Sequence, residues 1–457
     1  MISFKFLLAV ICCYYSFFTM GQLLQHEYHL SAPQFESVPL EGDFLLTGFF
    51  ELGNVDQSED KIGWRLTVEN QVWAEAILNQ AGKNQLIWGS TPETRQIQTA
   101  VKTDFSILQL ERAGNQLIMR GAHIGEPLQE IASTIIENLP YNLIGGVFIE
   151  GNSNTSGHVW NLRVDLPVGK SYNAYQSGLL TARLEWLDIN SLNRQIIYTD
   201  EIGFEAPNWL ENNDLIFNQK GLIFKINPNS GKTIQIETGN VVQNNNDHVV
   251  SWSGKELAIS SSSEGFSSRI YRLPITGGVP QLVTPNAPSY LHGWSNDERY
   301  LVYTAQRNNE DYNLFRIEIN TQKEEQLTFN KGLTDGPEYS PDGKYIYYNG
   351  TQSGTMQIWR MNTDGSDPEQ LTFDAQNDWF PHISPDNQWI VFVSFPTSVS
   401  PLDHPHYQRI EIRIMPVAGG APRTLAYVYG GQGTMNVPSW SPDSKKIAFV
   451  SYQGRIN

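Results

Sequence analysis

Residues 377–395 read NDWFPHISPDNQWIVFVSF, and the pattern of this stretch recurs along the chain. Related copies read DGPEYSPDGKYIYYNG at 335–350 and NVPSWSPDSKKIAFVSY at 436–452. Each copy has a short apolar segment, a Ser-Pro-Asp turn and a segment rich in β-branched and aromatic residues. This order is typical of two antiparallel strands joined by a tight turn.

The copies belong to a repeat with a period of 42 to 45 residues, marked by the aromatic or aliphatic residue that ends each first strand. The last interval is 57 residues long and contains an insertion. Six residues mark six units: Trp209, Trp252, Trp294, Tyr339, Ile383 and Trp440. A third and a fourth strand follow in each unit, as in MQIWRM and the segment ending QLT. Four antiparallel strands in this length predict a propeller blade.

The two ends of the repeat region complement each other. The sixth unit stops after two strands, and residues 182–199, ARLEWLDINSLNRQIIYT, resemble the missing second half of a blade. Pairing strands from both ends would close the ring without an open sheet edge. We therefore predict a six-bladed β-propeller over residues 182–457 that is closed in this way.

Residues 22–170 follow a different pattern, with alternating strands and few helical signals. Segments such as GDFLLTGFFELG and HVWNLRVDLP predict a β-sandwich of the jelly-roll or concanavalin-like kind. Residues 171–181 are the expected linker. The predicted fold class is all-β, with the sandwich ahead of the propeller.

The first 21 residues, MISFKFLLAVICCYYSFFTMG, have an early lysine, a short apolar run and small residues near the end. This pattern predicts a secretory signal peptide cleaved near Gly21 and a periplasmic or secreted protein. The alternative, a signal anchor, would need a longer apolar run. No later run is long enough to span a membrane. Both cysteines lie in this leader, so we expect neither thiol catalysis nor Cys-ligated zinc in the mature chain.

The formal net charge is −17 at pH 7. A charge of this sign repels phosphate backbones and anionic lipid surfaces. We therefore expect no nucleic-acid partner.

The phrases PEYSPDGKYIYY, PHISPDNQWIVF and PSWSPDSKKIAF closely resemble the repeats of the TolB-like β-propeller family. The resemblance covers residues 182–457 and implies a six-bladed propeller in a Gram-negative periplasmic or extracellular setting. TolB itself has an α/β N-terminal domain, which the segments before residue 170 do not resemble. The resemblance is specific for the fold and weak for activity, because this repeat occurs in scaffolds and enzymes alike.

The histidines of the repeat region fall at two kinds of position. His248, His292 and His382 precede the innermost strands of three units, whereas His404 and His406 lie in the long loop of the fifth unit. In blades of this type both positions are expected at the upper mouth of the central channel. We predict binding residues at this mouth: Asp247, His248, Tyr290, His292, Arg307, Asp335, Glu338, Trp379 and Asn436.

A more specific hypothesis is that the same channel mouth holds a metal ion. Neutral imidazoles and amide or carboxylate oxygens that converge on one axis suit a divalent cation. Oligogalacturonate lyase, a propeller with similar repeats, holds manganese with histidines and a glutamine, and this resemblance suggests the ligands His292, His382, His404, His406 and Gln432. Manganese, zinc or calcium would be the cofactor. The alternative for these residues is a structural or partner-binding role without a metal.

Two functions remain open on sequence grounds. The first is an exported propeller that binds a carbohydrate polymer or an envelope protein at the channel mouth, where aromatic and amide side chains suit sugars. The second is a metal-dependent carbohydrate-active enzyme, specifically a polysaccharide or oligosaccharide lyase that resembles oligogalacturonate lyase. No residue is assigned as catalytic, and the sequence does not decide whether the protein is an enzyme. Asp342, Asp386 and Asp443 in the repeat turns are predicted to be structural.

Overall fold

The computed structural model describes most of the chain, and all structural statements refer to these residues. They are 28–53, 60–79, 82–89, 91, 94–99, 104–167, 180–263, 265, 267–308 and 310–454. The described residues form β-strands and contain no α-helix, so the all-β prediction is confirmed. The predicted signal peptide and most of the predicted linker lie outside the described residues.

The N-terminal strands form two antiparallel sheets of six strands each. In sheet order, the first contains β1 (Tyr28–Ser31), β12 (Ser156–Asp165), β3 (Phe44–Leu52), β8 (Ile107–Ala113), β9 (Gln116–Ala122) and β10 (Gln129–Ile135). The second contains β2 (Gln34–Glu41), β11 (Asn142–Glu150), β4 (Lys61–Val68), β5 (Gln71–Asn79), β6 (Asn84–Trp88) and β7 (Gln96–Thr99).

One apolar core joins these two sheets because side chains alternate along each strand. Leu46 and Phe50 from β3 pack with Trp64 and Leu66 from β4. The rings of Phe50 and Trp64 meet edge to face with centroids 5.5 Å apart. The Trp64 indole N–H donates a hydrogen bond of 3.0 Å to the Leu108 carbonyl in the opposite sheet, which satisfies its buried polar group.

Residues 180–454 form six further sheets, five of them with four strands in sequential order. The first sheet contains β15 (Glu205–Trp209), β16 (Leu215–Gln219), β17 (Leu222–Asn227) and β18 (Lys232–Ile236). The second contains β19 (Asn244–Val250), β20 (Glu256–Ser261), β21 (Arg269–Pro274) and β22 (Gln281–Leu282). The third contains β23 (Ser289–Trp294), β24 (Tyr300–Ala305), β25 (Asn313–Glu318) and β26 (Glu324–Gln326). The fourth contains β27 (Thr334–Tyr339), β28 (Tyr345–Gly350), β29 (Gln357–Asn362) and β30 (Glu369–Gln370). The fifth is β31 (Asn377–Ile383), β32 (Trp389–Phe395), β33 (Gln408–Pro416), β34 (Arg423–Gly430).

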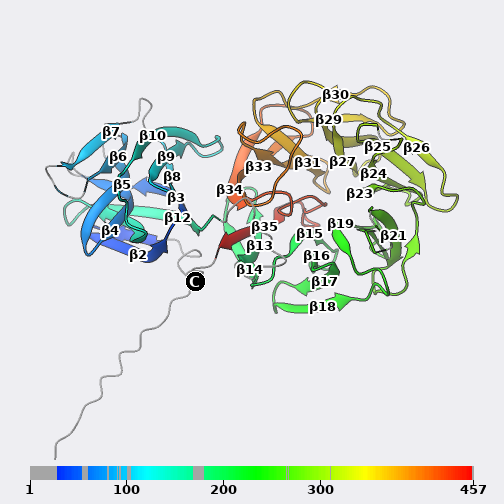
Figure 1. Ribbon diagram of the computed structural model, residues 1–457, viewed down its shortest axis with the longest axis horizontal. Coiled ribbons are helices and arrows are strands. Elements are labelled where there is room, and N and C mark those ends of the chain that lie inside the picture. Colours follow the sequence, from blue (N-terminus) through cyan, green and yellow to red (C-terminus); the bar gives the residue numbers. More distant parts are fainter. Residues whose placement is uncertain are drawn as a thin grey trace, which may run out of the picture.

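The sixth sheet pairs strands from opposite ends of this region. Its order is β14 (Arg194–Asp200), β13 (Leu180–Asp188) and β35 (Lys446–Gly454). Strand β13 is antiparallel to β35 along its whole length. The six sheets surround a common centre, and β15, β19, β23, β27 and β31 lie nearest to it (Figure 1).

Turns after the innermost strands fix the repeat locally. In the turn at Ser340, the hydroxyl donates a hydrogen bond of 2.7 Å to the Asp342 carboxylate and accepts one of 3.0 Å from the Tyr345 backbone N–H. The Ser441 and Asp443 side chains form the same bond, at 2.7 Å. These aspartates therefore shape the turns, as the sequence predicts.

Tryptophans connect neighbouring sheets. The Trp294 indole N–H donates to the Val249 carbonyl at 2.9 Å, and the Trp252 indole N–H donates to the Trp294 carbonyl at 3.0 Å. Trp440 donates to the His382 carbonyl at 2.9 Å. Each bond joins one sheet to the next, so these repeat residues hold the ring together.

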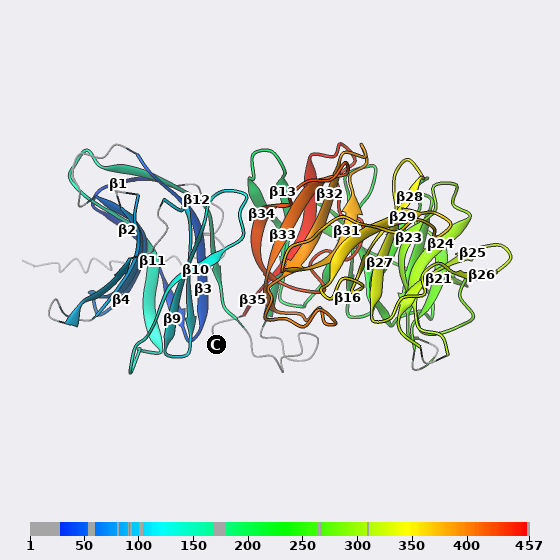
Figure 2. The same ribbon diagram turned by 90° about the horizontal axis from the view of Figure 1, so that it is seen from above.

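The N-terminal sheets lie beside the ring and face β33 and β34 (Figure 2). An apolar cluster crosses the contact, with Phe49, Ile107 and Ala122 against Tyr427. Arg163 and Arg194 both bind the buried Glu185 carboxylate, each at 2.8 Å. Buried charges of this kind are tolerated only when paired, so the junction is specific as well as apolar. The described part of the chain has no helix with the length and hydropathy of a membrane crossing.

Candidate functional site

A cavity of about 390 Å³ opens at the end of the ring where the innermost strands begin. We call it the upper cavity. It receives side chains from β19, β23 and β27, from β31, and from the loops after β32 and β34. Its lining consists of Asn245, Asn246, Asp247, Tyr290, His292, Thr304, Tyr312, Leu333, Asp335, Phe380, Leu402, His404, Gln432 and Asn436.

An irregularity in the strand register brings these side chains to the axis. The pairing of all five innermost strands of the four-stranded sheets shifts within the strand, for example between Asp335 and Glu338 in β27 and between Trp379 and His382 in β31. A bulge re-aims side chains and increases local twist. Phe380 has a φ of 56°, in the left-handed region that a residue with a bulky side chain rarely adopts. Strain of this kind collects at functional sites.

A buried charge pair forms the floor of the upper cavity. His292 Nε2 lies 3.2 Å from an Asp335 carboxylate oxygen, and each side chain is nearly inaccessible to solvent. Burial alone would lower the pKa of His292, but the hydrogen bond and charge of Asp335 outweigh it and raise the pKa. Burial would raise the pKa of Asp335, whereas His292 lowers it to about 2. The pair is therefore imidazolium and carboxylate over a wide pH range.

Asp247 is the second carboxylate of the upper cavity. Burial, reinforced by the charge of Asp335 and opposed by that of His292, raises the pKa of Asp247 to about 6. Its two oxygens accept hydrogen bonds from the side-chain amides of Asn436, at 3.1 Å, and Asn245, at 2.7 Å. Asp247 is thus ionised at neutral pH but close to its protonation point.

His404 covers the cavity from the loop after β32. Its ring meets the edge of Trp379, with centroids 4.5 Å apart, and of Phe380, at 5.5 Å. Burial lowers the pKa of His404, and Asp335, 4.0 Å away, only partly opposes this. The ring is therefore neutral near pH 7, and its buried Nδ1 has no hydrogen-bond partner.

A second cavity, of about 430 Å³, lies at the face that carries the Ser-Pro-Asp turns. We call it the lower cavity. All six residues that mark the repeat line it: Trp209, Trp252, Trp294, Tyr339, Ile383 and Trp440. Pro341, Pro385 and Pro442 of the turns border it as well. Because the tryptophans also bond neighbouring sheets, we interpret the lower cavity as a consequence of how the ring is assembled.

The sequence profile of the TolB β-propeller domain family matches residues 286–401. An uncharacterised protein of Agrobacterium fabrum is 40% identical over 277 residues, which are 60% of this chain and 94% of that protein. This chain belongs to the TolB-like β-propeller family.

A solved structure of a TolB-type protein from Agrobacterium tumefaciens agrees with this assignment. It is 40% identical, has a TM-score of 0.58 and matches 60% of this chain and 98% of its own. A manganese-bound oligogalacturonate lyase has 12% identity and a TM-score of 0.38, covering 61% of this chain and 77% of that one. A likeness this distant carries no argument about chemistry.

The upper cavity of this TolB-like propeller contains many of the residues that the sequence singled out. Those that line it are Asp247, Tyr290, His292, Asp335, His404, Gln432 and Asn436. They come from five different segments of the chain, and the register shifts bring them together. The grouping supports the choice of this mouth as the candidate site.

Six predicted residues do not line the upper cavity, and the placement of Glu338 needs correction. Glu338 lines the lower cavity and binds His382, with His Nδ1 2.6 Å from a carboxylate oxygen. It is three residues from Asp335, on the other side of the bulge in β27, and so faces the opposite end of the ring. His406 pairs with Glu205 at 2.9 Å.

The remaining three are enclosed by the fold. His248 and Trp379 are fully buried. Arg307 binds the Glu324 carboxylate at 2.7 Å and the Pro288 carbonyl at 2.6 Å, away from the cavity lining. The repeat period predicts where residues lie along a strand, but it does not predict how a bulge changes the direction of their side chains.

The predicted metal ligands do not form one coordination sphere. His292, His382 and His406 each pair with a different carboxylate, namely Asp335, Glu338 and Glu205. Within the described ranges, no group of three or more His, Cys, Asp or Glu side chains is arranged to hold a metal ion. The residues therefore do not fit the metal centre that the sequence suggested.

Sequence reasoning missed several lining residues. Tyr312 precedes β25, and its ring centroid lies 6.3 Å from that of Tyr290. Asn245, Asn246, Thr304, Leu333, Phe380 and Leu402 complete the set. The run NNND before His248 is a signal that could have found the two asparagines. Thr304 lies in β24 and Tyr312 lies just before β25, and neither position carries such a signal.

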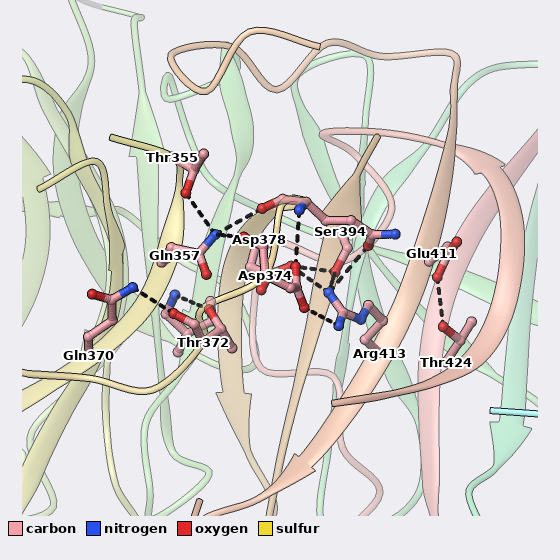
Figure 3. A network of polar contacts seen from close by, with 12 residues as sticks. Thr355, Gln357, Gln370, Thr372, Asp374, Asp378, Ser394, Glu411, Arg413 and Thr424 are labelled. Atoms are coloured by element: carbon pink, nitrogen blue, oxygen red, sulfur yellow. Dashed lines mark hydrogen bonds and ion pairs between the residues drawn. The ribbon is translucent and has the colours of Figure 1, made fainter. Parts of the chain in front are cut away.

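A polar network behind β31 holds one wall of the cavity (Figure 3). The Arg413 guanidinium binds the carboxylates of Asp374 and Asp378, the latter at 3.2 Å. The Ser394 hydroxyl donates a bond of 2.6 Å to the same Asp378 oxygen. Because Asp378 directly precedes Trp379 and Phe380, the network fixes the strand segment on which His404 packs.

Proposed function

We propose that this protein is an exported TolB-like propeller that binds a carbohydrate polymer through the upper cavity. The observation that carries the proposal is the composition of the cavity: the rings of Tyr290, Tyr312 and Phe380 stand beside amide, hydroxyl and carboxylate groups. Apolar sugar faces stack on aromatic rings, while sugar hydroxyls bond to polar side chains.

The size of the cavity favours a small group over a folded partner. About 390 Å³ is within the range of small-molecule sites, so the cavity holds one or two sugar rings or the end of a chain. An envelope protein would have to insert a side chain or a chain end into it. We keep the envelope protein as the alternative partner and base the experiments on the carbohydrate.

The same proposal includes the architecture and location of the protein. We propose that the six sheets from β13 to β35 are six blades, closed by strands from both ends, and that residues 22–170 form a sandwich domain joined to residues 182–457 by a linker. A signal peptide at residues 1–21 would place the mature chain in the periplasm or outside the cell. The sandwich offers a second surface to the polymer.

The lyase alternative depends on a metal-binding ring of histidines. Three of the five expected ligands, His292, His382 and His406, each pair with a different carboxylate, which does not support a shared metal site. The three His–carboxylate pairs have a simpler role: each satisfies a buried charge at the centre of the propeller.

A glycan array tests the proposal with the purified full chain. The variant Tyr290→Ala/Tyr312→Ala removes two aromatic contacts and is expected to weaken binding to every positive glycan about tenfold or more. The matched control is Phe329→Ala/Phe373→Ala, because both rings are exposed, at 78% and 76%, and lie outside the cavity lining. Retained binding in the tyrosine variant, with its fold intact by circular dichroism, would contradict the proposal.

A further inference from the structure

We propose that the upper cavity selects sugars that carry a protonated amino group over neutral and acidic sugars. This inference rests on the proposed carbohydrate binding and specifies the class of ligand. It follows from three features of the lining: an excess of hydrogen-bond acceptors, an acidic charge balance and aromatic walls.

The first feature is a buried acceptor without a partner. A carboxylate can only accept hydrogen bonds, so the Asn436 amide must turn its NH₂ group toward Asp247, where it bonds at 3.1 Å. This orientation leaves the Asn436 side-chain oxygen unbonded, although the residue is only 1% exposed. A buried unpaired acceptor costs free energy, so a donor on the ligand is favoured there.

Further acceptors lie in the same lining. The neutral His404 ring has a buried, unpartnered Nδ1. Asp247 has lone pairs beyond its two amide bonds, and Asp335 is within 4.0 Å of the His404 Nε2. An ammonium group supplies three donors at one point, whereas a hydroxyl supplies one. The geometry therefore matches an amino group better than a hydroxyl.

The second feature is charge. The described lining residues include two carboxylates, Asp247 and Asp335, and one imidazolium, His292, but neither lysine nor arginine. Glu205 acts on Asp247 from the neighbouring strand β15, and its charge is partly offset by His406, which it binds at 2.9 Å. A cation is attracted to this cavity, and a uronate carboxylate would be repelled by it. The net charge of −17 acts in the same direction over longer distances.

The third feature is the aromatic wall. Tyr290 and Tyr312 form one side, with ring planes inclined by 48°, and Phe380 forms another. The face of an aromatic ring attracts a cation within about 6 Å. The same rings stack on the apolar face of a sugar, so the amino and ring portions of an amino sugar are both accommodated.

Isothermal titration calorimetry with three tetrasaccharides at pH 6.5 tests the inference. The probes are a chitosan tetramer with free amino groups, the matched N-acetylated chitin tetramer, and tetragalacturonate. We expect the chitosan tetramer to bind at least about tenfold tighter than the chitin tetramer, and tetragalacturonate to bind weakest. In Asp247→Asn the preference for the amino probe should fall about tenfold, while the affinity for the chitin tetramer should change little. Asp403→Asn, an exposed carboxylate outside the lining, is the matched control and should keep the preference.

The outcomes separate this inference from the proposed function. Equal affinity for the chitosan and chitin tetramers, or tightest binding of tetragalacturonate, overturns the amino-group preference but leaves carbohydrate binding in place. If the array is positive for neutral glycans and the chitosan tetramer does not bind, the inference is also wrong. Tri-lysine serves as a further probe: affinity equal to that of the chitosan tetramer would overturn the amino-sugar assignment in favour of a peptide.

Discussion

At the scale of the residue, the upper cavity depends on carboxylates that the fold buries at a cost. Asp247 is held by two asparagine amides, yet it has no cation bonded to it in the described structure. Asp335, in contrast, forms an ion pair with His292. The pKa of Asp247 is therefore raised and that of Asp335 is lowered, because only Asp335 is paired with a positive charge.

This difference predicts a pH-dependent effect of Asp247→Asn on stability. The pKa of Asp247 is about 6 in the folded protein and near 3.8 when exposed, so the folded state holds its proton more tightly. Stability falls as pH rises from about 4 to 6, and the ionised group costs up to about 3 kcal/mol above that range. We expect Asp247→Asn to raise the free energy of unfolding by about 1 to 3 kcal/mol at pH 7.5, because the neutral amide removes the cost of burying a charge. Its weaker hydrogen bonds to Asn245 and Asn436 reduce this gain.

Urea unfolding at several pH values measures this effect. The gain in the free energy of unfolding should shrink as pH falls from about 6 to 4 and should be lost below pH 3.8, where the carboxyl is mostly protonated in both states. Asp403→Asn should change the free energy of unfolding by less than about 0.5 kcal/mol at every pH. Destabilisation by Asp247→Asn at pH 7.5, or a gain that grows as pH falls, would contradict this account of the cavity.

At the scale of the element, the innermost strands are the parts that convert a repeat into a site. In four of the five bulged strands, residues before or within the bulge line the upper cavity and residues after it line the lower cavity, as Asp335 and Glu338 do in β27. Strand β31 has the additional positive φ at Phe380. Arg413 on β33 holds this strand in position through its ion pair with Asp378.

Removing Arg413 should therefore loosen β31. Burial raises the pKa of Asp378 to about 7, and Arg413 opposes this rise. In Arg413→Met the carboxylate loses its paired charge, which costs about 3 kcal/mol when it is ionised. We expect this loss in the free energy of unfolding at pH 8 and a smaller loss at pH 6, because Asp378 can take up a proton.

A double-mutant cycle with Asp378→Leu separates the pair from the packing. The double variant should be more stable than the sum of the two single changes predicts, since it leaves no unpaired buried charge. Arg299→Met, which removes an exposed ion pair with Glu318, is the control and should change the free energy of unfolding much less than Arg413→Met does. Equal losses in the Arg413 and Arg299 variants would show that the network does not support β31.

At the scale of the whole molecule, strands distant in sequence hold the two parts together. Strand β13 follows the N-terminal sheets in the chain and pairs with β35 at the other end. Glu185 in β13 binds Arg163 from β12 and Arg194 from β14, and the Ser451 hydroxyl in β35 donates to it. One buried carboxylate thus links the N-terminal sheets to the sheet that contains the chain's last described strand.

The fold of the protein could be predicted from the sequence more completely than the residues that line the upper cavity. The repeat period depends on side-chain types at regular positions, so the strands, the turns and the TolB-like family could be predicted. The bulges are backbone irregularities with no residue type of their own: Gly336 has a φ of 61° in β27, whereas Ala206 and Phe380 adopt similar values in β15 and β31. For that reason Glu338 and His382 were expected at the upper mouth but lie toward the opposite end, and Tyr312 was not anticipated at all.

A crystal structure of the full chain with the glycan that gives the strongest array signal would show where the carbohydrate binds. We predict sugar density in the upper cavity, against Tyr290 and Tyr312 and within hydrogen-bond distance of Asp247 and Asn436. Density in the lower cavity among the repeat tryptophans, or only on the N-terminal sheets, would contradict the assignment of the upper cavity as the binding site.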